Sequence, residues 1–306
     1  MEVVSVFYKL FSKGGQKLTT LLQKLTIIFI ITVNILYASE YKNRVVLGLT
    51  GVVLKEDIAT IVKLKRYLEK KSHLNIAFKF VKSYAEIKTL LLNESIDFAY
   101  ICGSTYVDLE PSKKVELLAL PTVDAKPFYQ SLVVVQRDAN YTSLYDLKGK
   151  IFAISDPESN SGSLVPKYQI YKKGYDFSNF FKKVVVTYDH GESIEAVRLG
   201  FVDGASVDSV VYKAYVTKNP NKAKELKVIN SFGEYPIPPF VIREDVKSSI
   251  KQELKKAMLS MASDKEGKAI LKTLAIDGFI APNNISYKKI KAIKEYLNQK
   301  ESPNDR

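Results

Sequence analysis

Strand-like and helix-like segments alternate twice along this chain, and this alternation narrows the folds that it can adopt. In the first run, apolar segments at 44–49, 75–81 and 96–101 are separated by segments with helical spacing at 58–71 and 83–92. A β-α-β-α-β order is typical of a parallel sheet whose crossovers are right-handed. We therefore predict an α/β layer from the first third of the chain.

A second alternation occupies residues from about 130 to 225. Its expected strands are 132–135, 151–154, 183–187, 202–207 and 226–230, and its expected helices are 141–147, 164–172, 193–199 and 209–218. The chain then continues through a proline-rich strand at 236–242 to helices at 246–262, 265–273 and 287–297, with a turn at 277–279. This pattern predicts an α/β fold of two lobes, each a mostly parallel sheet flanked by helices, with a ligand cleft between them.

The boundaries of the lobes follow from these two runs. We expect residues 1–38 to precede the folded protein, 39–130 to begin the first lobe, 131–226 to form an inserted second lobe, and 227–306 to return to the first lobe and end in helices. Two segments, near Val133 and Val228, would cross between the lobes. The loops that end strands, at 50–51, 103–106, 156–163, 188–191 and 208–209, would face the cleft.

The N-terminal segment has the features of an export signal. Four lysines, Lys9, Lys13, Lys17 and Lys24, precede a largely apolar run at 25–36, and small residues follow at Ala38 and Ser39. A basic region, a short apolar core and a small-residue cleavage site are typical of a secretory signal. The run is shorter than the ~20 residues of a membrane span. We therefore expect cleavage and a periplasmic location, with an uncleaved membrane anchor as the alternative.

Composition argues against several classes of function. The net charge is +13, but the lysines are spread along helical segments beside acidic residues, which is typical of solvated helix faces rather than of nucleic-acid binding. Cys102 is the single cysteine and excludes an internal disulfide, and the two histidines, His73 and His190, are too few for a multi-histidine zinc site. We expect no metal, no cofactor and no nucleic-acid partner.

The loop at 156–163, with the sequence Asp-Pro-Glu-Ser-Asn-Ser-Gly-Ser, is the strongest candidate for a binding site. It follows a buried strand and precedes a helix that tolerates Pro166 only in its first turn. The first N–H groups of a helix are unpaired and its dipole is positive there, so hydroxyls and a glycine at this point suit an anion. The alternative is an ordinary helix N-cap that binds nothing.

Other polar residues stand at the ends of neighbouring strands. His190 could hydrogen-bond an anion or could be a loop histidine. Asp208 could accept a hydrogen bond from a protonated oxyanion, could cap the next helix, or could do both. Tyr100, Thr105 and Tyr106 flank Gly103 and could either bind a ligand or simply pack.

Catalytic motifs are absent from the sequence. It contains no G-x-S-x-G elbow, Walker A pattern, G-x-G-x-x-G or H-E-x-x-H. A nucleophile could be built only from Cys102 with His190 as its base. We therefore expect a protein that is not an enzyme, and we assign no catalytic residue.

The order and spacing of several motifs resemble those of one transporter family. The segments 146–150, 156–162, 190–197 and 200–203, followed by Asp208, are similar to the solute-binding proteins of phosphate, phosphite and phosphonate ABC transporters. So are 97–100 with Gly103 and Tyr106, and 235–238; the resemblance covers roughly residues 44–290. Asn160 stands where the family frequently has threonine, and Tyr188 and Asp189 stand where Gly-Ser often precedes the histidine.

The resemblance implies a type II periplasmic binding fold that holds a phosphorus oxyanion between its lobes. It implies that the oxyanion oxygens contact Ser159, Asn160, Ser161 and the backbone at Gly162, with His190 and Asp208 taking the remaining oxygens and Tyr100 and Tyr106 lining the other lobe. We expect a monomeric, exported binding protein that delivers its ligand to an ABC permease. A membrane-tethered sensor of the same fold and a cleft enzyme using Cys102 and His190 are the alternatives.

Overall fold

The computed structural model describes Thr26, residues 43–50 and residues 58–301. Apart from Thr26, the predicted export signal at 1–38 lies outside the described residues. Both sheets belong to one compact unit that begins at Val45. Among the residues that the structure describes, no helix combines the length and the apolar composition needed to cross a membrane.

The first lobe is built on a six-stranded sheet in the order β11-β4-β10-β3-β1-β2. Its strands are β1 (Arg44–Leu49), β2 (Asn75–Phe80), β3 (Phe98–Tyr100), β4 (Val115–Thr122), β10 (Phe240–Arg243) and β11 (Gly278–Ile280). One face packs against α2 (Ile58–Ser72), α10 (Ser248–Leu259), η5 (Met261–Ser263) and α11 (Lys265–Thr273). The other packs against α3 (Tyr84–Leu92), α4 (Gly103–Leu109), which continues into η2 (Glu110–Ser112), and α12 (Lys288–Glu301).

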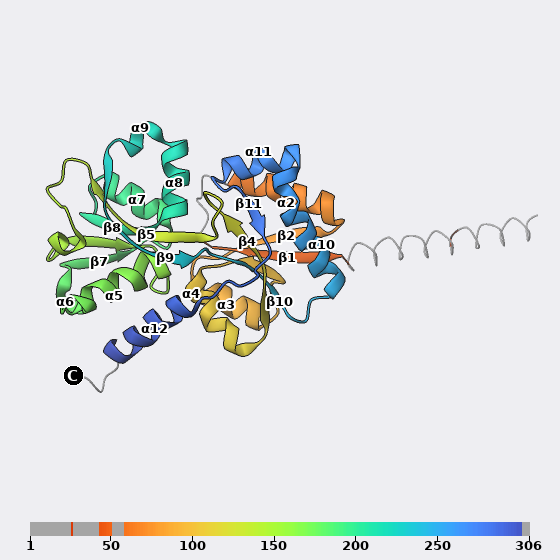
Figure 1. The fold of residues 1–306 in the computed structure, drawn as a ribbon, viewed down its shortest axis with the longest axis horizontal. Coiled ribbons are helices and arrows are strands. Elements are labelled where there is room, and N and C mark those ends of the chain that lie inside the picture. The colour runs from red at the N-terminus through yellow and green to blue at the C-terminus, as the bar shows by residue number, and fades with distance from the viewer. Residues whose placement is uncertain (1–25, 27–42, 51–57, 302–306) are drawn as a thin grey trace, which may run out of the picture. The chain divides into compact units, whose positions relative to one another are not determined.

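The second lobe is built on a five-stranded sheet in the order β7-β6-β8-β5-β9. Its strands are β5 (Phe128–Gln136), β6 (Ile151–Ile154), β7 (Lys183–Val186), β8 (Gly204–Asp208) and β9 (Leu226–Pro236). Helices α7 (His190–Arg198), α8 (Ser209–Lys218) and α9 (Pro220–Ala223) cover one face, and η3 (Leu144–Leu147), α5 (Val165–Lys172) and α6 (Phe177–Phe180) cover the other. Figure 1 shows these two helical layers on opposite sides of the strands.

Both sheets are mixed, whereas the sequence pattern predicted mostly parallel ones. β1 pairs with β3 in parallel, and β6 pairs in parallel with β7 and β8. β10 and β11 run antiparallel to their neighbours, as β5 does to β8 and β9. Parallel pairing needs a crossover connection, usually a helix. The chain enters β5 and β10 directly from the other sheet, without such a helix, and these strands pair antiparallel.

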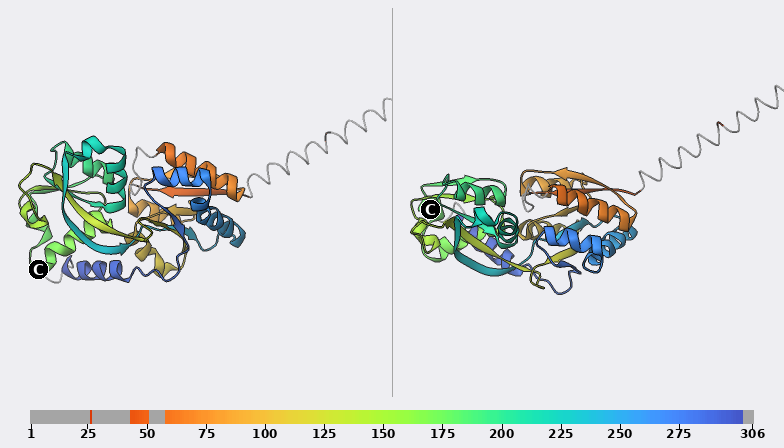
Figure 2. Two further views of the ribbon diagram at one scale, coloured as in Figure 1. Left: turned by 45° about the horizontal axis from the view of Figure 1, so that its top comes forward. Right: turned by 90° about the horizontal axis from the view of Figure 1, so that it is seen from above.

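The chain passes between the two sheets at two places. It leaves the first sheet after Thr122, at the end of β4, and enters the second at Phe128; it leaves the second after Pro236 and re-enters the first at Phe240. Because β9 continues to Pro236, the return comes later than the boundary expected at residue 227. Helix α12 adds a further link, since it packs against α4 of the first lobe and α5 of the second (Figure 2).

Two local predictions were wrong, while others were confirmed. The segment predicted as a loop at 103–106 is the start of helix α4, and the predicted turn at 277–279 gives way to β11, which pairs with the end of β4. The start of α4 packs closely against α12, since a Cβ on Gly103 would lie 2.8 Å from Ile290 Cδ1. By contrast, α8 and α11 have the predicted bounds.

Candidate functional site

The loop after β6 forms the strand–loop–helix junction that the sequence predicts. Its end is a π-helical turn, η4 (Asn160–Leu164), and α5 follows with Pro166 in its first turn. Ser159 caps the turn, because its Oγ accepts a hydrogen bond from the Gly162 N–H at 3.1 Å. The π-helical geometry was not predicted; such single turns occur frequently at functional sites.

Gly162 allows three polar side chains to lie close to the turn. A Cβ at this position would be 2.2 Å from Ser155 Oγ, 3.0 Å from Ser159 Oγ and 3.2 Å from His190 Cε1. Any larger residue would displace at least one of these groups. The glycine is therefore required by close approach, and the imidazole of His190 lies directly against the loop.

His190 begins helix α7 and is completely enclosed, with 1% of its surface exposed. Its Nδ1 accepts a hydrogen bond from the Asp208 backbone N–H at 3.2 Å, and its Nε2 lies 3.4 Å from Ser155 Oγ. Burial lowers the pKa of His190 to about 3, so the ring is neutral at physiological pH. Because Nδ1 accepts, the proton is on Nε2, which makes His190 a hydrogen-bond donor beside the loop.

Asp208 ends β8 and caps α8, so the capping prediction is confirmed. Its Oδ1 accepts hydrogen bonds from the N–H groups of Val210 at 2.7 Å and Val211 at 3.3 Å. Burial raises the pKa of Asp208 to about 7, against the weaker opposing effect of these two hydrogen bonds. The carboxyl group is therefore able to hold or exchange a proton near neutral pH.

Two serines that the sequence reading missed hold the turn in place. Ser131 of β5 and Ser206 of β8 each donate a hydrogen bond from Oγ to the carbonyl oxygen of Ser161 at 2.7 Å. Their hydroxyls lie 3.0 Å apart, and all three residues are buried. The available signal was a hydroxyl residue within an otherwise apolar strand, which calls for a buried hydrogen-bond partner.

Asn160 is held by two further groups. Its backbone N–H donates to Cys102 Sγ at 3.4 Å, and its Nδ2 donates to the hydroxyl of Tyr129 at 2.9 Å. Its Oδ1 is buried and has no hydrogen-bond partner among the described residues. Tyr129 was also missed from the sequence, because it precedes the strand predicted at 132–135.

The first lobe brings Tyr100 to this region. Tyr100 stacks on Phe240, with ring centroids 4.7 Å apart. The pKa of Tyr100 is raised well above its ordinary value, first by burial and then by the negative charge of Asp208. Since Asp208 belongs to the second lobe, the two predicted site residues approach each other from opposite lobes.

The other two predicted residues of the first lobe lie on α4. Thr105 is fully buried, and its Oγ1 has no partner within the part of the chain that the structure describes. Tyr106 packs its ring against Tyr287, with centroids 4.9 Å apart, and burial with the nearby Glu110 raises its pKa. Tyr106 also lines a pocket of about 210 Å³ with Lys288 and Lys291, and no residue of the 156–163 loop lines that pocket.

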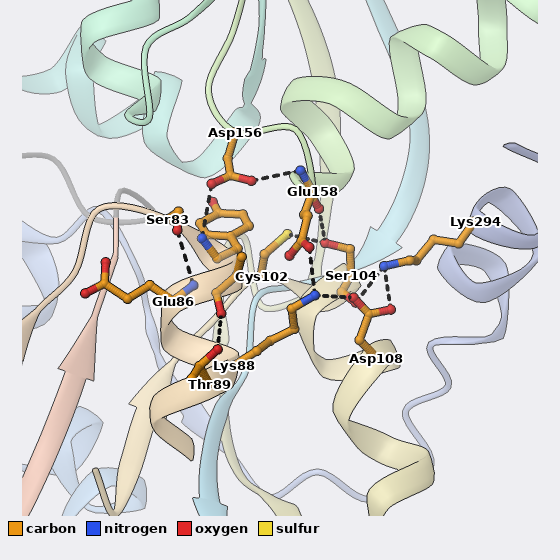
Figure 3. Close-up of polar contacts among 12 residues, drawn as sticks. Ser83, Glu86, Lys88, Thr89, Cys102, Ser104, Asp108, Asp156, Glu158 and Lys294 are labelled. Atoms are coloured by element: carbon orange, nitrogen blue, oxygen red, sulfur yellow. Dashed lines mark hydrogen bonds and ion pairs between the residues drawn. The ribbon is translucent and has the colours of Figure 1, made fainter. Parts of the chain in front are cut away.

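Hydrogen bonds and an ion pair attach the loop to the first lobe. Asp156 Oδ2 accepts from the Tyr84 N–H at 3.1 Å, and Glu158 Oε1 pairs with Lys88 Nζ at 2.7 Å. The carbonyl oxygen of Glu158 also accepts a hydrogen bond from the hydroxyl of Ser104. Figure 3 shows these contacts converging on α3 and α4. The loop that carries the candidate site is thus part of the contact between lobes.

The cation in this contact belongs to a larger charge network. Lys88 Nζ also lies 3.0 Å from Asp108 Oδ2, and Asp108 Oδ1 lies 2.6 Å from Lys294 Nζ of α12 (Figure 3). The side chains are only 17–31% exposed. Pairs in such a partly buried network contribute more than isolated surface pairs do.

The described contacts do not pair Cys102 with His190. Burial raises the pKa of the Cys102 thiol; its sulfur accepts a hydrogen bond from the Asn160 N–H and lies 3.3 Å from Ser104 Oγ. A protonated, enclosed thiol is a poor nucleophile. Among the described residues, no group of three or more histidine, cysteine, aspartate or glutamate side chains is arranged to hold a metal ion.

Two α/β lobes linked by crossing strands, with buried polar loops at the contact between them, define a periplasmic binding protein of the type II fold. Solved structures agree with this class. PhnD1 from Prochlorococcus marinus (MIT 9301), in complex with methylphosphonate, has a TM-score of 0.74 at 22% identity and covers 84% of this chain and 99% of its own. A binding protein component of an ABC phosphonate transporter from Pseudomonas aeruginosa has a TM-score of 0.71 at 22% identity, covering 84% and 96%.

The family model for the periplasmic phosphonate substrate-binding protein of ABC transporters matches residues 53–287, and the chain belongs to this family. The phosphonates-binding periplasmic protein of Escherichia coli (strain K12) is 27% identical over 231 residues, which are 74% of this chain and 68% of that protein. The probable ABC transporter phosphite binding protein PhnD1 of Prochlorococcus marinus (strain MIT 9301) is 24% identical over 246 residues, or 76% and 82%.

Proposed function

We propose that this protein is the substrate-binding component of an ABC importer and that it binds a small phosphorus oxyanion, namely a phosphonate, phosphite or phosphate. The observation that carries the proposal is the pairing of a neutral His190, which donates from Nε2, with Asp208, whose pKa is about 7. The Nε2–H of His190 can donate to an ionised ligand oxygen, and the Asp208 carboxylate can accept from a protonated one. Family membership and the methylphosphonate named with PhnD1 support the same ligand class.

The proposed ligand shell differs in part from the one that the resemblance implies. Ser159 Oγ already accepts from the Gly162 N–H, so its own proton is free to be donated to an oxyanion. The Gly162 N–H is engaged by that bond, and we give Gly162 a steric role instead. We retain Ser161, Asn160, His190 and Asp208 from the second lobe and Tyr100 and Thr105 from the first, and we leave out Tyr106.

Binding is tested by thermal unfolding and calorimetric titration of the exported protein with methylphosphonate, phosphite and phosphate. At a ligand concentration 100 times Kd, binding stabilises the folded state by about 2.7 kcal/mol. For a protein of this size that raises Tm by about 5–10 °C. Absence of a shift with all three anions would overturn the proposed ligand class.

We also propose that the chain acts in the periplasm as a monomer after removal of its N-terminal segment. The proposal rests on the basic and apolar pattern before Ser39 and on membership of a periplasmic family. N-terminal sequencing of protein recovered from the periplasm should begin near Ser39, and light scattering should give the mass of one chain. Recovery of the intact N-terminus in the membrane fraction would instead favour the tethered sensor.

A further inference from the structure

The amide of Asn160 and the hydroxyl of Tyr129 form a buried pair that the proposed function does not yet explain. Asn160 is completely buried and Tyr129 is 3% exposed. The 2.9 Å hydrogen bond runs from Nδ2 of the amide to the phenol oxygen. The second lobe therefore uses one side chain of β5 to fix the orientation of a side chain in the η4 turn.

Tyr129 is well placed to act on the site. It lies near the start of β5, just after the chain crosses from the first sheet, and it is paired in register with Tyr235 of β9. The two rings pack edge to face at 6.1 Å. Burial, followed by the nearby Cys102 and Asp208, raises the pKa of Tyr129 well above its ordinary value, so its phenol stays protonated.

The remaining hydrogen-bonding atom of this amide lacks a partner. Asn160 N–H is engaged by Cys102 Sγ and Nδ2 by Tyr129, whereas Oδ1 is buried without a partner among the described residues. A buried acceptor in this state favours the binding of a group that can donate to it. Asp208, with a pKa of about 7, is protonated at mildly acidic pH and can then donate a hydrogen bond rather than only accept one.

We propose that Tyr129 is a specificity-determining residue of this site: by holding Nδ2 of Asn160, it leaves Oδ1 as an acceptor that selects ligands carrying a proton on the anionic group. The inference rests on the proposed function and narrows it to the singly protonated form of a phosphorus oxyanion. A P–OH group donates to Oδ1. A sulfonate or sulfate has no proton to offer, so its oxygen would face an acceptor, and the site rejects it.

Methylphosphonate and methanesulfonate test this inference, because they have similar shape and differ in the proton. Both are titrated calorimetrically at one mildly acidic pH, at which methylphosphonate keeps a proton. The wild type should prefer methylphosphonate by at least about 100-fold. In Tyr129→Phe the amide loses its acceptor and is free to turn Nδ2 toward the ligand. Affinity for methylphosphonate should then fall about 5- to 10-fold, affinity for methanesulfonate should hold or rise, and the preference should narrow accordingly.

Tyr235→Phe is the matched control, since it removes a hydroxyl from the paired, equally buried tyrosine. It should leave both affinities unchanged. If Tyr129→Phe weakens both ligands by the same factor, its role is structural and the inference is overturned; unchanged affinities overturn it as well. Asn160→Ala is a second test, because deleting the Oδ1 acceptor should also reduce the preference for methylphosphonate over methanesulfonate. If the wild type binds no phosphorus oxyanion, the proposed function itself fails.

Discussion

The pH dependence of stability offers a sharp test of the site, because two neighbouring buried groups should oppose each other. Burial raises the pKa of Asp208 from 3.8 to about 7, so between these values the folded protein holds a proton that the unfolded chain has lost. The stabilisation that Asp208 contributes is fully present below pH 3.8 and is lost as the pH rises through about 7. His190 has its pKa lowered from 6.5 to about 3, so its contribution is lost as pH falls through that range.

The magnitudes follow from the shifts. One proton corresponds to about 1.4 kcal/mol per pH unit, so raising the pKa of Asp208 from 3.8 to about 7 amounts to about 4 kcal/mol. Between about pH 4 and 6.5 the slopes from Asp208 and His190 have similar size and opposite sign. In the wild type the two slopes nearly cancel. Removing one of the two titrating groups should therefore reveal the pH dependence that the other contributes.

Asp208→Asn removes the titrating group and retains a side-chain oxygen that can cap α8. The free energy of unfolding, measured in urea by circular dichroism without ligand, should rise with pH relative to the wild type by about 1.4 kcal/mol per unit from pH ~4 to ~7. Asp264→Asn is the control, because Asp264 caps α11 but has a lowered pKa. Its difference from the wild type should be flat from pH ~5 to ~7. A flat difference for Asp208→Asn as well would refute the argument.

Two further substitutions test the contacts around the loop. Lys88→Met breaks the ion pair with Glu158 and should weaken oxyanion binding about 3- to 10-fold by calorimetry. The control Lys65→Met breaks a pair of the same 2.7 Å length within α2 and should leave affinity unchanged. Equal effects of the two substitutions would contradict a specific role of the Lys88–Glu158 pair in binding. Gly162→Ala should destabilise the protein by about 1–3 kcal/mol in urea unfolding, because its Cβ would lie 2.2 Å from Ser155 Oγ. Adding Ser155→Ala should restore part of that loss, and an undiminished loss would show that the crowding lies elsewhere.

The parts of the site that the sequence predicts are those with local signals. The junction at 156–163 is recognisable because a short apolar strand, a hydroxyl-rich loop and a proline in the first helical turn follow each other directly. Asp208 is recognisable as a helix cap from the residues beside it. In these cases the hydrogen-bond partners lie within three residues, so the local sequence contains the reason for the structure.

The parts that the sequence misses depend on contacts between distant segments. Ser131 and Ser206 are 30 and 45 residues from the carbonyl that they bind, and Tyr129 is 31 residues from Asn160. Helix α4, which was predicted as a loop, also packs against an element distant in the sequence, α12. Strand register and helix packing decide such contacts, and neither is encoded by the spacing of residues within one segment.

The 156–163 loop can couple anion binding to the contact between the lobes, because it carries residues of both. The Ser161 carbonyl accepts hydrogen bonds from Ser131 of β5 and Ser206 of β8, so the second sheet holds the turn in place. In the same loop, Glu158 is bonded to the first lobe through Lys88 and Ser104. An anion held at Ser159 and Ser161 would therefore sit one residue from the contact between lobes. A ligand that binds more tightly when the lobes are in contact favours that contact, and linkage requires the lobe contact to favour the ligand equally.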